Sequence, residues 1–470
     1  MASPDDQFDL AIIGGGPAGY VAAISGAQHG ARVVLVEKQR VGGTCLNVGC
    51  IPTKVLTTAA ELLHYCKHAG ELGLAIPQVG VDLPALMGRK RALVDQLVGG
   101  VEQLLRARRI TLLRGTATLV RPDSLRVAAN DGDVREVLAG RVILAPGSVI
   151  AEPPIEGCSL PGVMTSTEAL EIDQVPPRLV VIGGGVIGME FACIYEALGS
   201  QVTVLEMAAS VLADATDEAV AKRLQLLLRR RGMDIQTGTT VQRIEQAGKV
   251  LRVVSKGPNG EVASEAERVL LAVGRWPNTQ GSGFSELGLR MNGRAVAVDE
   301  RLATSLPNVW AAGDAVGGWM LAHKAMVEGR IAAENAMGGH RRADDRITPN
   351  VIYTRPEIAS VGLTETQARS RGADVKVTQF PFSANPRARI IGEPDGFVRL
   401  ICEAGSGKVL GVHILGADAT DLIAEGALAV QLGITADDLA WTTHAHPTLP
   451  EAVLEAALGF GDAAIHALSR

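Results

Sequence analysis

The chain has 470 residues, of which 47% are hydrophobic and 20% charged, and its formal net charge is −6. A chain of this length is too long to fold around a single hydrophobic core, so we expect two to four domains. The acidic balance argues against a nucleic-acid partner, and no uncharged apolar run is long enough to span a bilayer. The opening stretch, MASPDDQFDL, resembles neither a signal peptide nor an arginine-rich transit peptide, which predicts a cytoplasmic protein.

The first predicted element is a strand, a tight turn, a helix and a second strand over residues 10–37. Two apolar runs flank the pattern Gly14-x-Gly16-x-x-Gly19, and the second run ends in Glu37. Glycines in such a turn let the backbone approach a pyrophosphate, which sits at the positive end of the following helix. Glu37, 23 residues after Gly14, is placed to accept a hydrogen bond from a ribose hydroxyl. The segment predicts a dinucleotide site.

Directly after this element, the stretch GGTCLNVGC places Cys45 and Cys50 five positions apart. The chain has six cysteines, and no other two are close in sequence. A zinc site would need a second pair of cysteines or histidines at similar spacing, so no metal site is predicted. The spacing alone leaves two interpretations open, a reversible disulfide and two unrelated buried thiols.

The glycine pattern recurs in the middle of the chain. Gly183-x-Gly185-x-x-Gly188 follows an apolar run, and Glu206 lies 23 residues after Gly183. Two such motifs, each with its acid at the same distance, predict two Rossmann-like dinucleotide-binding domains. An acid at this position favours an unphosphorylated ribose and repels a 2′-phosphate, so we expect NAD at the second site.

Two dinucleotides beside a cysteine pair suggest an electron relay. Hydride transfer and disulfide reduction are both two-electron steps, and a flavin can join them. We therefore expect FAD at the first site, where Glu37 suits the adenosine ribose.

Four blocks together carry a resemblance to a known family: GGTCLNVGCIPTK, AVGRWPNT (272–279), VWAAGDAVGGWMLAHKA (309–325) and HAHPTLPE (444–451). On these blocks the chain is identified as a member of the class I pyridine nucleotide-disulfide oxidoreductases, and within them it resembles the dihydrolipoamide dehydrogenases. The resemblance covers nearly the whole chain. It implies an α/β fold with two Rossmann-like dinucleotide-binding domains, for FAD and NAD, and a C-terminal α+β dimerisation domain.

The resemblance also implies the catalytic groups. Cys45 is expected to exchange with the substrate, and Cys50 is expected to face the flavin as its redox partner. His446 is implied as the acid–base group and Glu451 as the carboxylate that orients it, since a thiol needs a base to become a thiolate. His444 is then expected to be structural. In the family the histidine–glutamate pair comes from the partner subunit, which predicts an inactive monomer.

Further positions are implied around the cofactors. Lys54 is expected beside the flavin and paired with Glu190, where a cation favours negative charge on the reduced ring. Asp314 is expected near the ribityl–phosphate region. The remaining positions are Ala117, Ser148, Met320, Leu321, Ala322 and His323 for FAD, and Val241 and Gly274 for NAD.

The implied domains are an FAD-binding domain in residues 1–150, an NAD-binding domain in 151–275, a return to the FAD-binding domain in 276–345 and a dimerisation domain in 346–470. The implied reaction is oxidation of dihydrolipoamide through a disulfide and FAD, with hydride transfer to NAD+. The expected partners are a second copy of the chain and lipoyl domains of 2-oxo acid dehydrogenase or glycine cleavage complexes, with no nucleic acid and no membrane.

Two alternatives stand beside this interpretation. A related flavin disulfide reductase would act on another small disulfide; an NADP-linked one should carry basic residues near Glu206, and a mercuric reductase a further cysteine pair after Cys402. A non-catalytic flavin-binding subunit would have no need of the cysteines and the histidine–glutamate pair together. The chain departs from the family pattern at Pro146 and Pro450, where threonine and serine are usual, and in AHKAMVEG, which lacks a carboxylate often seen after the second alanine.

Overall fold

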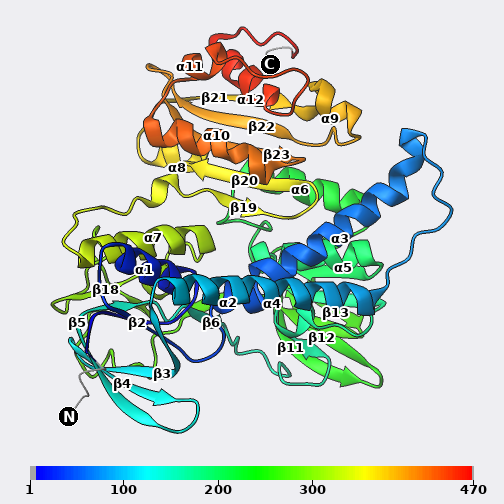
Figure 1. Cartoon of the computed structure of the whole chain (residues 1–470). Coiled ribbons are helices and arrows are strands. Elements are labelled where there is room, and N and C mark those ends of the chain that lie inside the picture. The colour runs from blue at the N-terminus through cyan, green and yellow to red at the C-terminus, as the bar shows by residue number, and fades with distance from the viewer. Residues whose placement is uncertain (1–6, 468–470) are drawn as a thin grey trace. The chain divides into compact units, whose positions relative to one another are not determined.

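The computed structural model describes residues 7–467, and its contacts divide the chain into two compact units (Figure 1). The first unit contains the residues up to Val55, Pro84–Glu152 and Gly274–Asp345. The second contains Leu56–Leu83, Pro153–Val273 and the residues from Arg346. Within residues 7–467, no helix has both the length and the apolar character that a membrane crossing requires.

The first unit is built on a parallel sheet in the order β3-β2-β1-β5-β18. β4 pairs antiparallel with the outer parts of β3 and β5. The strands are β1 (Gln7–Ile13), β2 (Val33–Glu37), β3 (Thr111–Arg121), β4 (Ser124–Ala129), β5 (Val134–Leu144) and β18 (Val309–Ala311). β2 is buried along its whole length, which suits a strand covered on both faces.

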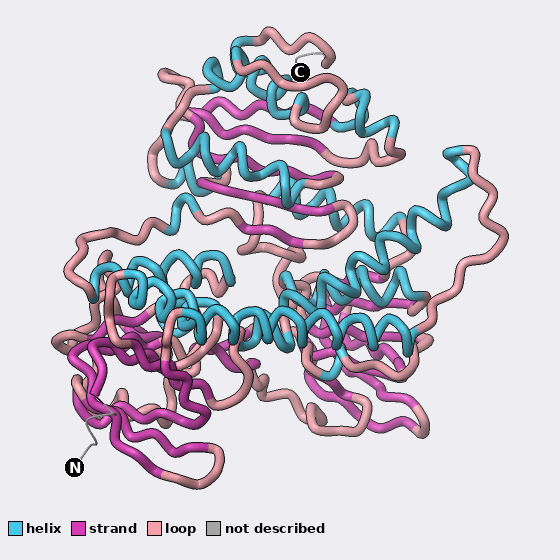
Figure 2. Tube along the Cα trace, viewed as in Figure 1, coloured by secondary structure: helices cyan, strands magenta, loops and turns pink. Residues whose placement is uncertain are grey.

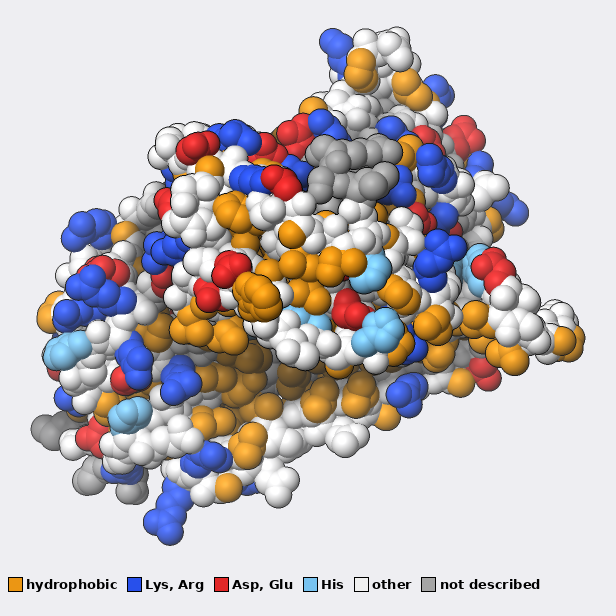
Figure 3. Space-filling model, turned by 90° about the horizontal axis from the view of Figure 1, so that it is seen from above, with side chains coloured by type: hydrophobic (Ala, Val, Ile, Leu, Met, Phe, Trp, Pro, Cys, Tyr) orange, Lys and Arg blue, Asp and Glu red, His pale blue; other side chains and the backbone are white. Residues whose placement is uncertain are grey.

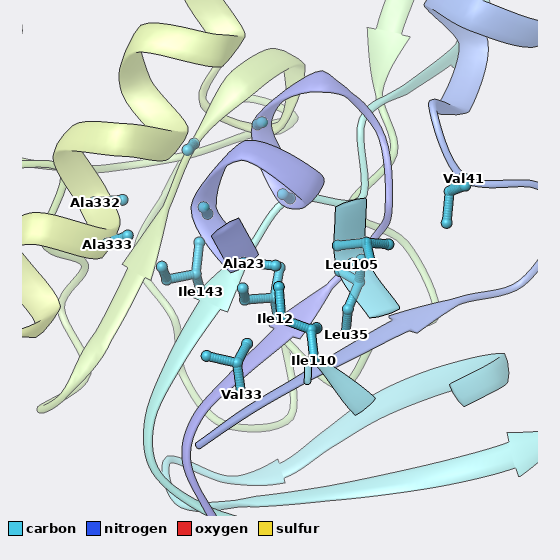
Figure 4. Packing of buried hydrophobic residues seen from close by; sticks show 14 of the residues in the cluster. Ile12, Ala23, Val33, Leu35, Val41, Leu105, Ile110, Ile143, Ala332 and Ala333 are labelled. Carbon is cyan, nitrogen blue, oxygen red and sulfur yellow. The ribbon is translucent and has the colours of Figure 1, made fainter. Parts of the chain in front are cut away.

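Helices α1 (Pro17–Gln28) and α7 (Ala322–Ala336) lie side by side against this sheet (Figures 1 and 2). Figure 4 shows Ile12, Val33, Leu35 and Ile143 from the strands close to Ala23 of α1 and to Ala332 and Ala333 of α7. The helix faces consist largely of alanine and glycine, so the two helices approach closely. The rest of the unit comprises α2 (Gly43–Val48), the start of α3 (Cys50–His68), most of α4 (Leu83–Ala107), β6 (Ser148–Ile150), β15 (Arg275–Pro277), β16 (Met291–Asn292), β17 (Ala295–Val296) and the 3₁₀ turn η4 (Gly313–Val316).

The second unit begins with another parallel sheet, in the order β10-β9-β8-β14-β7. Its strands are β7 (Val163–Met164), β8 (Arg178–Ile182), β9 (Gln201–Leu205), β10 (Asp234–Gln236) and β14 (Arg268–Leu271). Helix α5 (Val186–Leu198) connects β8 to β9, and α6 (Glu218–Arg230) precedes β10. An antiparallel sheet of β11 (Thr240–Ala247), β12 (Val250–Gly257) and β13 (Gly260–Ala266) is inserted before β14.

The C-terminal part of the second unit is an antiparallel sheet in the order β19-β20-β23-β22-β21. Its strands are β19 (Asn350–Ile352), β20 (Glu357–Gly362), β21 (Val375–Pro381), β22 (Phe397–Glu403) and β23 (Val409–Gly416). Helix α10 (Ala419–Leu432) packs on β20 and β23, and α12 (Glu451–Leu458) packs on β21 and β22. The remaining helices are α8 (Glu365–Ser370), α9 (Pro386–Ile390) and α11 (Ala436–Trp441), with short 3₁₀ turns η2 (Ala69–Leu72), η3 (Glu168–Leu170), η5 (Asp345–Ile347), η6 (Phe382–Ala384) and η7 (Gly459–Gly461).

Hydrophobic side chains reach the surface of the molecule among charged ones (Figure 3). In the C-terminal part, Leu428 and Leu432 of α10 and Trp441 of α11 are exposed. Grouped apolar residues on a surface commonly mark an interaction site. Leu428 and Leu432 lie one turn apart on α10, so this helix presents an apolar stripe that suits contact with another protein surface.

The predicted fold class is confirmed. Two parallel sheets each carry a glycine-rich turn after a buried strand, and an antiparallel sheet with helices follows them. The predicted four-part division stays a prediction, because the two compact units group the segments differently.

Candidate active site

The first glycine turn is tight enough to exclude any side chain at its start. Gly14 has φ +97°, and a Cβ there would lie 2.1 Å from the carbonyl oxygen of Ala145. Helix α1 begins directly after Gly16, with Pro17 in its first turn, where a missing backbone donor costs nothing. A Cβ at Gly19 would lie 1.7 Å from the oxygen of Gly14, so the turn and the helix are in direct contact. The free N–H groups of this helix start can receive a phosphate.

Glu37 lies beside this turn and also stabilises it through hydrogen bonds to the backbone. Its carboxylate accepts hydrogen bonds of 2.7 Å from the backbone N–H of Gly15 and from that of Gln39. Each carboxylate oxygen has a second lone pair, so the group can still accept from a ribose hydroxyl. The sequence predicted the position of the acid but not its bond to the turn.

The second glycine turn repeats this arrangement in the other unit. Gly183 has φ +107°, and a Cβ there would lie 2.4 Å from the oxygen of Ala272. Glu206 accepts hydrogen bonds of 2.6 Å from the N–H of Gly184 and from that of Ala208. Gly185 precedes the first residue of α5, and Gly188 lies in its first turn. The duplicated motif therefore forms two dinucleotide turns of the same construction.

Cys45 and Cys50 lie next to each other, although they belong to different helices. Cys45 is buried in α2, and Cys50 is the first residue of α3. A hydrogen bond with the Cys50 thiol, together with burial, raises the pKa of the Cys45 thiol, while the charge of Lys54 acts to lower it. Thiols close enough to share a hydrogen bond need little movement to reach disulfide geometry. This proximity is what a redox pair requires, and the redox role of the two cysteines stays a prediction.

A polar chain lies in the same unit as the cysteines. Ser148 donates to Oδ2 of Asp314 at 2.5 Å and accepts from Nε of Arg275 at 2.8 Å. A second guanidinium nitrogen of Arg275 donates to Oγ1 of Thr44, next to Cys45, at 3.4 Å. Burial lowers the pKa of Arg275, and the charges of Asp314 and Cys50 oppose that shift. Sequence reasoning named Ser148 and Asp314 but missed Arg275, although it follows Gly274 in the block AVGRWPNT.

The other positions expected near FAD also lie in the first unit. Ala117 is buried on β3, and Leu321 immediately precedes α7. Met320 comes before Leu321, and Ala322 and His323 are the first residues of α7.

One predicted pair, Lys54 with Glu190, and two positions predicted to line the NAD site, Val241 and Gly274, each draw on both units and stay predictions. Lys54 belongs to the first unit, whereas Glu190 belongs to the second, where it accepts from the N–H of Tyr353 at 2.9 Å. Val241 is buried on β11 in the second unit, and Gly274, with φ +108°, opens a segment of the first.

The backbone around Pro146, a residue that departs from the family pattern, still accepts hydrogen bonds. Its carbonyl oxygen accepts from Nδ2 of Asn278 at 3.3 Å, and the oxygen of Gly147 accepts from the N–H of Asn278 at 2.9 Å. The backbone here is therefore tied to the block that contains Arg275.

His446 and Glu451, which are expected to act as the acid–base group and its orienting carboxylate, are in contact in the second unit. Nδ1 of His446 lies 2.8 Å from Oε1 of Glu451, which fixes the tautomer with the proton on Nδ1 and leaves Nε2 as the acceptor. The His446 side chain is 70% exposed, so Nε2 is accessible. Burial acts to raise the pKa of Glu451, but hydrogen bonds from the N–H of Thr448 and from His446 outweigh it, and the pKa is lowered. The group is a carboxylate at neutral pH and can orient the imidazole.

His444 has the opposite surroundings. Its side chain is 5% exposed, with Nδ1 2.8 Å from the oxygen of Thr442 and Nε2 2.9 Å from Oε1 of Glu425. Neither nitrogen is available to a substrate, which agrees with the structural role expected for His444.

Among the described residues 7–467, no group of three or more histidine, cysteine, aspartate or glutamate side chains is arranged to hold a metal ion. The described residues offer a thiol pair in the first unit, a histidine–glutamate pair in the second, and one glycine-rich turn in each.

Comparison with known proteins defines the class. Residues 8–329 match the family model described as pyridine nucleotide-disulphide oxidoreductase, and residues 348–457 match the dimerisation domain of that family. The chain belongs to the pyridine nucleotide-disulphide oxidoreductase family. Its members are flavoprotein oxidoreductases, so the predicted class of enzyme and the predicted cofactors, FAD and NAD, are confirmed. The dimerisation domain supports the predicted homodimer.

Individual relatives show which kinds of family member the chain is similar to. The chain is 43% identical to the dihydrolipoyl dehydrogenase of Thermus scotoductus, over 98% of this chain and 99% of the relative. It is 40% identical to that of Bacillus subtilis, over 97% of this chain and 100% of the relative. Among solved structures it is similar to LpdA from Mycobacterium tuberculosis, with a TM-score of 0.88, 28% identity, and coverage of 96% of this chain and 99% of that one. It is also similar to the HOCl-induced flavoprotein disulfide reductase RclA from Escherichia coli, with a TM-score of 0.84, 30% identity and the same coverage.

Proposed function

We propose that this protein is a dihydrolipoyl dehydrogenase, which oxidises protein-bound dihydrolipoamide to lipoamide and transfers hydride to NAD+. The observation that carries the proposal is the Cys45–Cys50 thiol pair in the unit that also holds the first dinucleotide turn and the Asp314–Ser148 contact. Relatives with this activity in their names match the chain along almost its whole length.

The residues of the first unit fit FAD. The backbone turn from Gly14 to Gly19, in which a Cβ at either end would meet backbone oxygen, suits a pyrophosphate, and Glu37 suits a ribose. Asp314, held by Ser148, supplies an acceptor for the ribityl chain. Bound FAD would take two electrons from the thiols and deliver them as hydride to NAD+.

Residues of this chain carry out the thiol chemistry. His446, oriented by Glu451, accepts a proton from dihydrolipoamide at Nε2. The substrate thiolate attacks the sulfur of Cys45 in the oxidised pair, which breaks the Cys45–Cys50 bond and forms a mixed disulfide. The second substrate thiol then displaces Cys45, so that lipoamide leaves and the chain holds two reduced cysteines. The charge of Lys54 opposes the rise in the pKa of Cys45 that the Cys50 hydrogen bond and burial cause.

The alternative is a reductase for another small disulfide, which the likeness to RclA favours. A steady-state comparison separates the two proposals. We expect NAD-linked oxidation of dihydrolipoamide to be much faster than NADPH-linked reduction of glutathione disulfide. The reverse order would rule out the proposed activity.

The proposal includes partners and a location. Lipoyl domains of 2-oxo acid dehydrogenase or glycine cleavage complexes would present the substrate. The proposed location is the cytoplasm, where free thiols stay reduced; those outside the proposed redox pair are Cys66, Cys158, Cys193 and Cys402.

Hybrid dimers test whether the base comes from the partner subunit. One subunit carries Cys45→Ser and the other His446→Gln, each with its own affinity tag so that hybrids can be purified. If the base acts across the dimer, one of the two sites keeps both groups, and the hybrid has about half the wild-type dihydrolipoamide oxidation rate. If each subunit supplied its own base, both sites would lack a group and the hybrid would be inactive.

Glu206 is proposed to select NAD over NADP. The Glu206→Gln variant keeps an acceptor for the turn but removes the charge that repels a 2′-phosphate, so the preference for NAD+ over NADP+ is expected to fall about ten-fold or more. The measurement is the ratio of kcat/KM values for the two cofactors. Glu218→Gln, which changes an exposed acid on α6, is the matched control and should leave the ratio unchanged. An unchanged ratio in Glu206→Gln would assign selectivity to other residues.

A further inference from the structure

A buried ion pair lies directly behind the turn that carries Asp314. Lys324 and Glu328, one helical turn apart on α7, form an ion pair through Nζ and Oε1, and their side chains are only 5% and 4% exposed. The other carboxylate oxygen of Glu328, Oε2, accepts from the backbone N–H of Gly313 at 2.8 Å. Glu328 therefore joins helix α7 to the residue immediately before Asp314.

The stability of the fold does not by itself explain why this ion pair is buried. A buried ion pair loses its hydration, and apolar residues of similar size often stabilise a fold equally well or better. Burial raises the pKa of Glu328, opposed by the charge of Lys324 and the hydrogen bond from Gly313. Asp345 adds a second carboxylate 3.7 Å from Nζ of Lys324. The Glu328 carboxylate is thus held in place by a buried cation that it shares with Asp345.

The backbone around Gly313 has no room to adjust. Gly313 has φ +73°, and a Cβ there would lie 3.0 Å from Cβ of Ala18 and 3.3 Å from Cβ of Ala325. Next to Glu328, a Cβ at Gly329 would lie 2.2 Å from the oxygen of Ala18. Helix α7 is therefore packed directly on α1, and Glu328 meets Gly313 from a fixed position.

The Asp314 carboxylate is held on its other side by a side chain. Oδ2 accepts from Oγ of Ser148, and Arg275 in turn donates to that hydroxyl oxygen. The turn is thus tied to Glu328 through its backbone and to Ser148 through its side chain. Release of either tie would let the carboxylate change direction.

We propose that Glu328 is a positioning residue of the FAD site, which fixes the Gly313–Asp314 turn and so directs the Asp314 carboxylate toward the flavin chain. The inference rests on the proposed role of Asp314 in binding FAD. Lys324 serves this arrangement by holding the Glu328 carboxylate in place through their ion pair.

Two double variants separate positioning from stability. Lys324→Gln/Glu328→Gln removes both charges but keeps an acceptor for the Gly313 N–H. Lys324→Met/Glu328→Leu is apolar and removes that acceptor. The measurements are the FAD dissociation constant of the apoprotein, by flavin fluorescence, and the Tm of the apoprotein.

We expect the Gln/Gln variant to bind FAD within about three-fold of wild type, and the Met/Leu variant to bind about ten- to a hundred-fold more weakly, because a hydrogen bond to the turn is lost. The Tm of the Met/Leu apoprotein should stay close to that of Gln/Gln. Glu334→Gln changes a half-buried acid of α7 that pairs with Arg341; it is the matched control and should bind FAD as wild type does.

Equal FAD affinity of the two double variants would overturn the inference. If Met/Leu fails to fold, Glu328→Asp provides the same test, since it keeps the charge but draws the carboxylate back from Gly313; wild-type affinity there would overturn the inference too. A wild-type protein that binds no FAD would instead refute the proposed function itself.

Discussion

Replacing Cys45 with serine is expected to lower dihydrolipoamide oxidation about 10⁴-fold or more, because a hydroxyl cannot form the mixed disulfide. FAD should remain bound, since the first glycine turn and the Asp314–Ser148 contact are unchanged. Steady-state rates with NAD+ and the flavin absorption spectrum of the purified variant give the two measurements.

The control for this variant is a cysteine near the end of α3. Cys66→Ser alters a thiol that lies outside the proposed redox pair and should retain the wild-type rate. Reduction of an artificial electron acceptor by NADH should survive in Cys45→Ser, because that path needs no disulfide. Lipoamide turnover above a tenth of wild type in Cys45→Ser would refute the role assigned to this residue.

Replacing His446 with glutamine is expected to lower kcat for dihydrolipoamide about 10²- to 10⁴-fold, the usual contribution of a general base. The glutamine amide can still donate to Glu451 but cannot accept the substrate proton. The side chain of His446 is largely exposed, so the Tm should change little. Stopped-flow reduction of the enzyme by dihydrolipoamide measures the affected step directly, and reduction by NADH should keep its rate.

His444→Gln is the matched histidine control. His444 is buried against Thr442 and Glu425, so its loss should lower the Tm while the folded enzyme keeps kcat within a few-fold of wild type. A larger fall in kcat for His444→Gln than for His446→Gln would reverse the assignment of the two histidines.

The sequence predicted those parts of the site whose chemistry is local. Both glycine turns, with Glu37 and Glu206 after them, could be read from spacing because strand, turn and helix are consecutive. His446 and Glu451 lie in one short block, and the structure places them in contact, although their catalytic roles stay proposals.

Contacts between distant segments could not be predicted in this way. Arg275 reaches Ser148 over 127 positions, and Glu328 reaches Gly313 through the packing of α7 on α1. Nothing in the local sequence distinguishes Arg275 and Glu328 from charged surface residues, because their roles depend on burial in the folded chain. The bond from Glu37 to its own turn is not predictable for another reason: spacing assigns the acid to a ligand, and its hydrogen bond to the backbone appears only in the folded structure.

Anaerobic reduction of the purified enzyme by one equivalent of dihydrolipoamide tests most directly whether the cysteine pair exchanges electrons with the flavin. The account predicts a long-wavelength absorption band from a Cys50 thiolate against oxidised flavin, and loss of that band in Cys50→Ser. Reduction that bleaches the flavin without the band, equally in wild type and in Cys50→Ser, would contradict it.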